Sequence, residues 1–173
     1  MKPFGYSCYF QRVFYWKELS LRRKMRYMST ITIKARLILY NQGKILLLRQ
    51  KKRNGGNFTL VGGTMEEDET PMECLIRESQ EEAGIILKEE DLRLVHVLHK
   101  QTNKGKRITL YFKAHRWEGK LRSREPEKFS GVQWHHLYEL PSNLTNTVKH
   151  VLSKYRGGIY YSEFSTIPTT EIF

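Results

Sequence analysis

The chain has 173 residues, enough for one domain that buries about two-thirds of the surface of its unfolded form. Its hydrophobic content of 39% and charged content of 28% are those of an ordinary water-soluble globular protein, and no apolar run approaches the roughly 18 residues that span a bilayer. The two cysteines, Cys8 and Cys74, are too few for a disulfide scaffold or a metal knuckle, which favours a reducing, cytoplasmic setting.

The formal net charge of +12 is unevenly placed along the chain. Residues 1–29 carry seven Lys and Arg residues against a single Glu, so this short segment supplies half of the excess. The remaining residues hold 23 basic and 17 acidic side chains, out of totals of 30 and 18. A solvated basic surface explains this balance, which gives little support for nucleic-acid binding by the main domain.

Residues 1–29 differ from the rest of the chain because they combine eight aromatic residues with a basic run at 22–24. Aromatic and basic side chains together can stack on single-stranded nucleic acid. The segment is also typical of an appended surface extension, or of sequence upstream of a start at Met25 or Met28, and these two interpretations are favoured. We predict that residues 1–29 are an N-terminal extension outside the core domain. Nucleic-acid binding is not expected of this protein unless this extension provides it.

From Ile31 onward, hydrophobic periodicity predicts strands. Apolar residues alternate with mostly polar ones from Ile31 to Leu39, which is typical of a half-buried strand. A turn at 41–43 precedes a second, more continuously apolar strand, and further short apolar runs are bounded by turn residues. The predicted strands cover residues 31–39, 44–49, 57–61, 92–99, 107–117 and 131–134.

Two predicted helices interrupt this series of strands, one at residues 71–83 and one at 143–155. The second carries an apolar stripe and ends before two glycines, Gly157 and Gly158. The order of strands, helix, strands, helix predicts an α+β fold with a mixed β-sheet flanked by helices. Residues 159–173 are expected to form a loosely structured tail.

The first helix lies in an acidic segment, since residues 66–91 hold eleven of the chain's 18 acidic residues. Thr70 at the N-cap, Pro71 at the first helical position and Glu73 form a capping box, so we expect the helix to begin at Pro71. Gly84 is a natural residue to end it. The helix face expected to pack on the core consists of Met72, Leu75, Ile76, Ser79 and Ala83.

Three carboxylates of this helix, Glu78, Glu81 and Glu82, are spaced i, i+3 and i+4 on the side opposite to the core face. Their like charges destabilise a helix, and Arg77 alone cannot neutralise them. A solvated helix face would carry lysines interleaved at i+4, and that pattern is missing. The spacing therefore favours a hard divalent cation held by carboxylate oxygens over a solvated face.

Gly63, Glu69 and the run from Arg77 to Ile85 match the pattern G-x5-E-x7-R-E-U-x-E-E-x-G-U, where U is an aliphatic residue. This segment resembles the Nudix box, and residues 30–158 are identified as a Nudix domain similar to the small MutT-like nucleotide pyrophosphohydrolases. The one departure is Ser79, at a position where the family prefers an aliphatic residue, and we expect it to affect packing rather than chemistry. The resemblance implies the Nudix α/β/α sandwich.

The resemblance also implies a Mg²⁺-dependent hydrolase, in which Mn²⁺ can substitute. Glu78, Glu81 and Glu82 are then metal ligands, and the backbone carbonyl of Gly63 or Gly62 completes the shell. Glu78 is either a ligand or the base that deprotonates the attacking water. Mg²⁺ suits the reaction because it neutralises a polyanionic pyrophosphate and lowers the pKa of bound water.

Supporting roles follow from the same resemblance. Arg77 is grouped with the catalytic residues, and it pairs with Glu69 to hold the loop to the helix. Gly62 and Gly84 support the loop and the helix end. The remaining acids have no matching role and are expected to be solvated: Glu66, Glu67, Asp68, Glu73, Glu89, Glu90 and Asp91.

Four further residues are candidates for substrate binding. Small Nudix enzymes often draw a carboxylate from a late loop, where Glu125 and Glu127 stand here, with a surface salt bridge as the alternative. Arg49 belongs to a group of basic residues just before the box, with Lys51, Lys52 and Arg53. These residues either contact the phosphates of the substrate or form a basic surface loop without a binding role. Phe58 stands where the family often has an aromatic residue; it either stacks on a base or packs in the core, and the core is favoured.

The box is shared by enzymes that hydrolyse nucleoside triphosphates and by enzymes that cleave nucleoside diphosphate conjugates, so it leaves the nucleotide substrate open. Either reaction would release a nucleoside monophosphate. The alternative is a catalytically silent Nudix-fold nucleotide sensor or regulatory module, against which the intact Glu78, Glu81 and Glu82 argue. We expect a cytoplasmic monomer or homodimer with no membrane partner.

Overall fold

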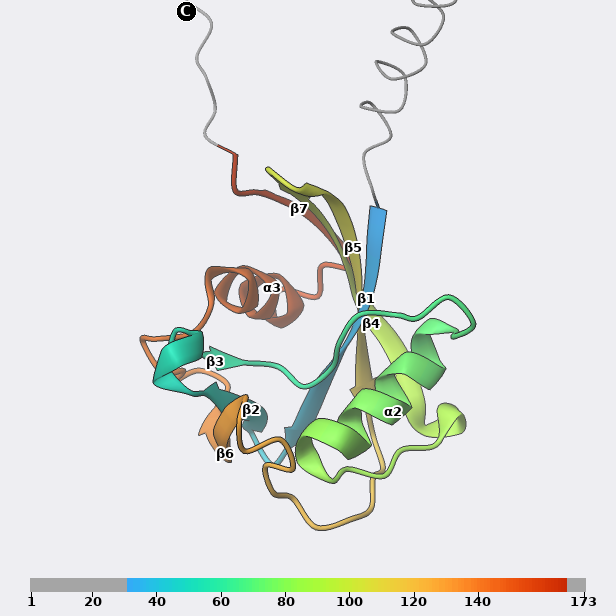
Figure 1. The fold of residues 1–173 in the computed structure, drawn as a ribbon, viewed down its shortest axis with the longest axis vertical. Coiled ribbons are helices and arrows are strands. Elements are labelled where there is room, and N and C mark those ends of the chain that lie inside the picture. The colour runs from blue at the N-terminus through green and yellow to red at the C-terminus, as the bar shows by residue number, and fades with distance from the viewer. Residues whose placement is uncertain (1–30, 168–173) are drawn as a thin grey trace, which may run out of the picture. The chain divides into compact units, whose positions relative to one another are not determined.

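The computed structural model describes residues 31–167. The predictions made for residues 1–29, and for the chain after 167, lie outside this described part. Within it, no helix is both long enough and apolar enough to cross a membrane. The described chain is built around a mixed β-sheet with helices packed on it (Figure 1).

The strands are β1 (Ile31–Asn41), β2 (Lys44–Gln50), β3 (Phe58–Thr59), β4 (Leu92–Thr102), β5 (Gly105–Ala114), β6 (Phe129–His136) and β7 (Tyr161–Ser165). Their order in the sheet is β3-β2-β1-β5-β4-β7, and β6 pairs with β2 beside this path. β1 is parallel to β5 and β4 is parallel to β7, whereas the other pairs are antiparallel. The predicted mixed sheet is confirmed.

The helices α2 (Pro71–Ala83) and α3 (Asn146–Arg156) lie on opposite sides of the central strands (Figure 1), and η1 (Lys52–Asn54) and η2 (Glu89–Asp91) are short 3₁₀ turns. The capping box of α2 is confirmed: the Glu73 amide donates to Thr70 Oγ1 (3.2 Å), and the Thr70 amide donates to Glu73 Oε2 (2.7 Å). α3 begins later than predicted, because the side chain of Thr145 caps it.

β1 is buried on both faces, although its alternation predicts burial of only one. Ala35 packs in a cluster with Leu75 of α2, and Ile38 packs in a second cluster with Val151 of α3. β2 carries a continuous buried run at 45–48 for the same reason, since each face of the sheet is covered by a helix. The core is therefore divided by the sheet into two halves.

The glycine loop, residues 60–65, runs along the part of β1 that β2 leaves unpaired. The amide of Ala35 donates to the carbonyl of Gly63 (3.2 Å), and the amide of Leu37 donates to that of Val61 (2.9 Å). These bonds give partners to backbone groups that would otherwise be buried without any. They also fix the loop between β1 and the start of α2 (Figure 1).

The prediction of a loosely structured tail at 159–173 is wrong for β7, which pairs in parallel with β4. Ser162 of β7 is buried, and its Oγ lies 2.9 Å from Nε2 of both His96 and His150. A short polar strand gives a weak signal in the sequence because its partners are distant in the chain. Pairing with β4 and the two histidines hold it in place.

Asp91 is buried, so the expectation that it lies on the solvated surface is wrong. Its Oδ1 accepts a hydrogen bond from Nε of Arg116 (2.8 Å) and lies 3.2 Å from Nε2 of His115. A buried carboxylate is stable only when it is paired. The residues that follow β5 supply the partners here.

Ser162→Ala should lower the free energy of unfolding by about 1–3 kcal/mol, because it leaves two imidazole nitrogens in a buried place without their common partner. Urea unfolding measures this change, and amide exchange should show faster opening of β7. A variant as stable as wild type would mean that the two histidines do not hold β7.

Ser79→Ala is the same change at another buried serine, and it should change the free energy of unfolding in the opposite direction. Ser79 is fully buried on α2, and its Oγ has no hydrogen-bond partner in the described part of the chain. Removing an unpaired buried hydroxyl from a helix should raise the free energy of unfolding by up to about 1 kcal/mol. A loss of stability in the same urea assay would show that the hydroxyl contributes to packing.

Candidate active site

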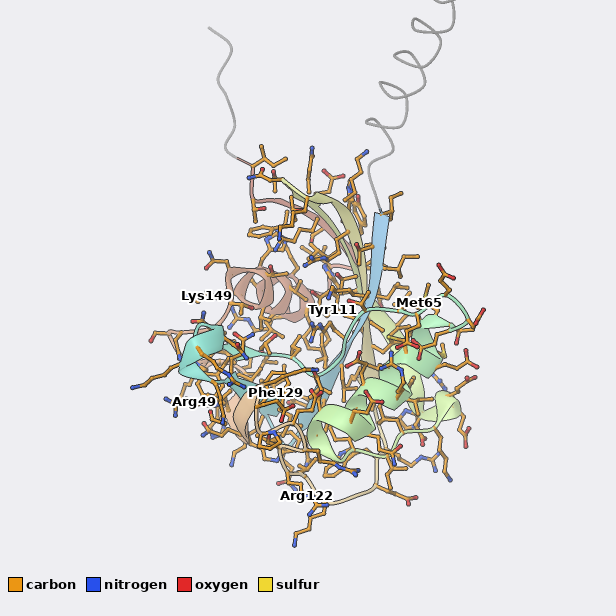
Figure 2. The ribbon with its side chains drawn as sticks, in the orientation of Figure 1. Arg49, Met65, Tyr111, Arg122, Phe129 and Lys149 are labelled. Carbon is orange, nitrogen blue, oxygen red and sulfur yellow. The ribbon has the colours of Figure 1, made fainter. Side chains whose placement is uncertain are left out.

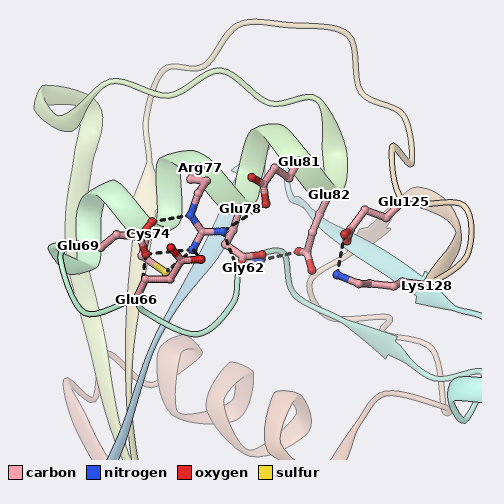
Figure 3. A network of polar contacts seen from close by, with 10 residues as sticks. All are labelled: Gly62, Glu66, Glu69, Cys74, Arg77, Glu78, Glu81, Glu82, Glu125 and Lys128. Atoms are coloured by element: carbon pink, nitrogen blue, oxygen red, sulfur yellow. Dashed lines mark hydrogen bonds and ion pairs between the residues drawn. The ribbon is translucent and has the colours of Figure 1, made fainter.

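Glu82 joins α2 to the glycine loop. Its side chain is almost fully enclosed, with 6% of the residue exposed, and its Oε2 accepts a hydrogen bond from the amide of Gly62 at 2.8 Å (Figure 3). Gly62 has φ +121°, and a Cβ there would collide with the carbonyl of Ala35. Only glycine lets the loop lie close enough to β1 for this bond to form.

The three helix carboxylates therefore differ in environment, and the prediction that all of them lie opposite to the core is wrong for Glu82. Glu82 follows the buried Leu75 by seven residues, so it lies at the border of the core face, where the glycine loop covers it. The Glu78 side chain is 16% exposed and that of Glu81 is 52% exposed. The spacing from Leu75 was a signal in the sequence for this burial.

Glu78 lies against the second glycine of the loop. A Cβ at Gly63 would overlap the Glu78 carboxylate, so the absence of a side chain makes room for it. Gly63 thus brings a backbone carbonyl and a carboxylate side by side. That carbonyl accepts one hydrogen bond, from Ala35, and a carbonyl oxygen has a second lone pair.

Arg77 is surrounded by carboxylates (Figure 3). Its guanidinium forms a forked pair with Glu69, with distances of 2.5 Å from Nε to Oε1 and 3.0 Å from Nη2 to Oε2. Nη1 lies 3.3 Å from Oε1 of Glu78 and 3.2 Å from Oε2 of Glu81. The hydrogen bond from Arg77 lowers the pKa of Glu69 to about 2. The structure thus brings together the supporting pair that the sequence predicts.

Burial raises the pKa of Glu82 to about 7, while Arg36 and the Gly62 amide act in the opposite direction. The nearby carboxylates of Glu78 and Glu125 raise it further. Without a cation, negative charge at this position is therefore unfavourable. A divalent cation would invert this effect, because it stabilises the ionised form of any carboxylate beside it.

The donor atoms around the glycine loop are oxygens, which are the ligands that a hard cation prefers. Glu78 and Glu82 offer carboxylate oxygens beside the Gly63 carbonyl, and oxygen is the donor that Mg²⁺ prefers. Glu125 adds a buried Oε2 for which the described residues offer no hydrogen-bond partner. Within residues 31–167, no three acidic, histidine or cysteine side chains converge closely enough to form a ready-made metal cage. Glu78 and Glu81 contact Arg77 instead, so we expect their side chains to turn when a cation binds.

The late loop brings one of its two predicted carboxylates to the site. Glu125 lies beside Glu82 (Figure 3), and its Oε1 accepts a hydrogen bond from Nζ of Lys128 at 2.6 Å. The amide of Arg124 donates to the Glu82 carbonyl (3.0 Å), which ties this loop to α2. Glu127 is exposed, and its backbone carbonyl accepts a hydrogen bond from the Arg53 guanidinium.

The two other candidates for substrate binding lie away from the carboxylates. Phe58 is 6% exposed and packs in the core edge-on to His135, with ring centroids 4.8 Å apart. The structure thus favours the core alternative for Phe58. Arg49 is exposed on β2, with its guanidinium 5.8 Å from the centroid of the Phe58 ring.

Sequence reasoning missed four basic residues that line a cavity of about 280 Å³ near the glycine loop: Lys34, Arg36, Lys100 and Arg107. Arg36 links this cavity to the carboxylates, since its Nη1 donates to the carbonyl of Leu60 (2.8 Å) and its charge lowers the pKa of Glu82. In the sequence Lys34, Arg36 and Arg107 were polar positions of predicted strands, and Lys100 followed the end of one. Only the register of three strands reveals that they face one space.

The NUDIX domain model matches residues 31–155, which is most of the chain. The chain belongs to the NUDIX family. It is a Nudix hydrolase, and enzymes of this kind act on phosphoric anhydrides. The matched range contains the glycine loop, all of α2 and the late loop, so the residues described above lie within the family domain.

Solved Nudix structures confirm the fold. A MutT NUDIX hydrolase from Burkholderia pseudomallei is 25% identical, with a TM-score of 0.65 over 72% of this chain and 97% of that one. A mutator MutT protein from Bacillus halodurans is 24% identical, with a TM-score of 0.64 over 81% and 93%. A UDP-X diphosphatase is 18% identical, with a TM-score of 0.53 over 84% and 75%.

Glu82→Gln should stabilise the metal-free Nudix hydrolase above neutral pH. The pKa of Glu82 is raised in the fold from an ordinary 4.5 to about 7, so its favourable contribution is complete below pH 4.5 and is lost as the pH rises through 7. Glutamine keeps the acceptor for the Gly62 amide and cannot ionise. In EDTA, the gain over wild type should be near zero at pH 4.5 and about 1–3 kcal/mol at pH 8, measured by urea unfolding.

Glu73→Gln provides a control of opposite sign. The hydrogen bond from the Thr70 amide lowers the pKa of Glu73, so this carboxylate stabilises the fold above its ordinary pKa of 4.5. The variant should be less stable than wild type at pH 8 and should approach it as the pH falls below 4.5. A Glu82→Gln protein that unfolds more easily than wild type at pH 8 would make the Glu82 charge a structural requirement.

Proposed function

We propose that this Nudix hydrolase is a Mg²⁺-dependent nucleotide pyrophosphohydrolase that cleaves a nucleoside triphosphate or a nucleoside diphosphate conjugate and releases a nucleoside monophosphate. The observation that carries the proposal is the placement of the Glu78 and Glu82 carboxylates against the two glycines of the loop. The same proposal places the protein in the cytoplasm, as a monomer or homodimer, with a nucleotide as its small-molecule substrate.

Glu78, Glu81, Glu82 and the Gly63 carbonyl would hold the metal, with Glu125 as a further ligand on the side of the late loop. Bound Mg²⁺ supplies neutralisation of the pyrophosphate charge and a lowered pKa of water. The excess of carboxylates around Arg77 supports this assignment, because one guanidinium contacts Glu69, Glu78 and Glu81 and leaves net negative charge.

The protein's own groups have distinct tasks in this mechanism. Glu78 is either one of the metal ligands or the base that accepts the proton of the attacking water, since its carboxylate is partly exposed and borders the glycine loop. Arg77 is a positioning residue, because its fork to Glu69 fixes the guanidinium that contacts Glu78. Arg36 lies between the carboxylates and the basic cavity, where its charge can orient an anionic substrate.

A nucleotide sensor without turnover is the second candidate, and product analysis separates it from an enzyme. The full chain with Mg²⁺ should convert at least one member of a panel of nucleoside triphosphates and nucleoside diphosphate conjugates to a nucleoside monophosphate. Chromatography of the products measures this. Saturable binding across the panel without release of a monophosphate would favour the sensor.

Glu82→Gln should lower kcat by a factor of about 100 or more, because it removes a carboxylate that holds the metal. The loss cannot come from unfolding if the variant is at least as stable as wild type at the pH of the assay. Mg²⁺ should raise the melting temperature of wild type more than that of the variant. Glu73→Gln, which weakens only the helix cap, should keep turnover near that of wild type.

A further inference from the structure

The basic cavity, lined by Lys34, Arg36, Lys100 and Arg107, lies between the sheet and the start of α3. Hydroxyl groups complete its wall, including that of Tyr111, which projects from β5 into the space between the central strands and α3 (Figure 2). No aspartate or glutamate of residues 31–167 lines it. The cavity is thus a concentration of positive charge on the side of the sheet opposite to α2.

Strand register explains why four bases meet there. Lys34 and Arg36 are two residues apart on β1, so their side chains share a face of the sheet. Lys34 is paired with Thr109 of β5. Arg107 precedes Thr109 by two residues in β5, and it is paired with Lys100 of β4. The first turn of α3 closes the cavity and contains no acidic residue, so its amides add positive potential.

No carboxylate of the described chain directly contacts the bases of this cavity, although Glu78 acts on Lys34 and Arg36 acts on Glu82 at longer range. None of the four bases forms an ion pair with an acidic side chain among residues 31–167. The Nε of Arg107 is buried without a hydrogen-bond partner. Burial, followed by the charges of Arg36 and Arg107, lowers the pKa of Lys34 to about 8. These like charges repel one another, and an anion bound among them would relieve the repulsion.

We propose that this cavity binds a phosphate group of the substrate that lies beyond the scissile anhydride, so that the preferred substrates carry additional phosphate there. A phosphate matches the site because guanidinium, ammonium and hydroxyl donors all bond to its oxygens. An uncharged sugar or base would leave four cations unpaired. The statement that the bound phosphate is part of the substrate rests on the proposed function. The statement that the cavity binds an anion rests on the residues that line the cavity.

Binding of inorganic phosphate tests the site without turnover. In EDTA at constant ionic strength, phosphate should shift the amide resonances around Thr109 and Lys100 of the full chain in a saturable way. Arg107→Gln should raise the Kd for phosphate by about tenfold or more, the effect of losing one charge-assisted pair. Lys44→Gln removes an equal charge at an exposed position of β2 outside the cavity, and should leave the Kd within about twofold.

The stability of Arg107→Gln gives a second readout. Its melting temperature without phosphate should equal or exceed that of wild type, because Lys34 and Lys100 lose a repelling neighbour. With phosphate, the order should reverse, because only wild type gains from binding. A variant that melts well below wild type without phosphate would make Arg107 a structural residue and would overturn the proposal.

Kinetics then identify the phosphate as part of the substrate. For the nucleoside that the panel selects, kcat/KM should rise from the diphosphate to the triphosphate to the tetraphosphate, and Arg107→Gln should flatten this rise through KM with kcat within about threefold. Phosphate binding without any turnover would mean that the proposed function fails and the anion site stands. Turnover without saturable phosphate binding, or an unchanged series in Arg107→Gln, would overturn the inference.

Discussion

The hydrogen bond from the Gly62 amide to the Glu82 carboxylate holds together the parts of this site. It fastens α2 to the glycine loop, and the loop in turn completes the open edge of β1 through its own backbone bonds. Because the carboxylate is nearly enclosed, the bond forms in a place where water competes poorly. The same enclosure makes the charge unfavourable although the bond itself favours the ionised carboxylate, so a cation beside Glu82 would offset the cost of burial.

β1 separates two kinds of electrostatic environment. On the side of α2, carboxylates collect around Arg77 and the glycine loop, whereas on the side of α3 four bases surround a cavity. Arg36 belongs to the basic cavity, donates a hydrogen bond to the Leu60 carbonyl, and lowers the pKa of Glu82 through its charge. A substrate that is itself a polyanion can use both environments, since the acids would bind it through a metal and the bases would bind it directly.

Among residues 31–167, two of the four buried side-chain polar atoms without a hydrogen-bond partner lie in these regions, and the other two belong to Ser79 and His135. The Oε2 of Glu125 lies beside the carboxylates, and the Nε of Arg107 belongs to the basic cavity. Each such atom costs free energy in the unliganded protein, and a ligand with the complementary charge would recover it. Ser79 differs from them, because its Oγ is directed into the packed core beneath α2, where no ligand can reach it.

The sequence by itself determined the features that depend on neighbours a few residues apart. The bounds of α2 follow from Thr70, Glu73 and Gly84, because a helix begins and ends through hydrogen bonds between residues three or four positions apart. The Nudix box was readable for the same reason, since its acids lie on one helix and the loop before it. The mixed sheet followed from the order of strands and helices.

Only the tertiary structure decided which polar side chains are buried and what they face. The enclosure of Glu82, the core position of Phe58 and the pairing of β7 all depend on segments far apart in the chain. The basic cavity depends on the register of β1, β5 and β4, and an alternating pattern gives the same faces for every register that differs by two residues. Local hydrogen bonding is encoded in local sequence, whereas burial and charge clustering are properties of how the elements meet.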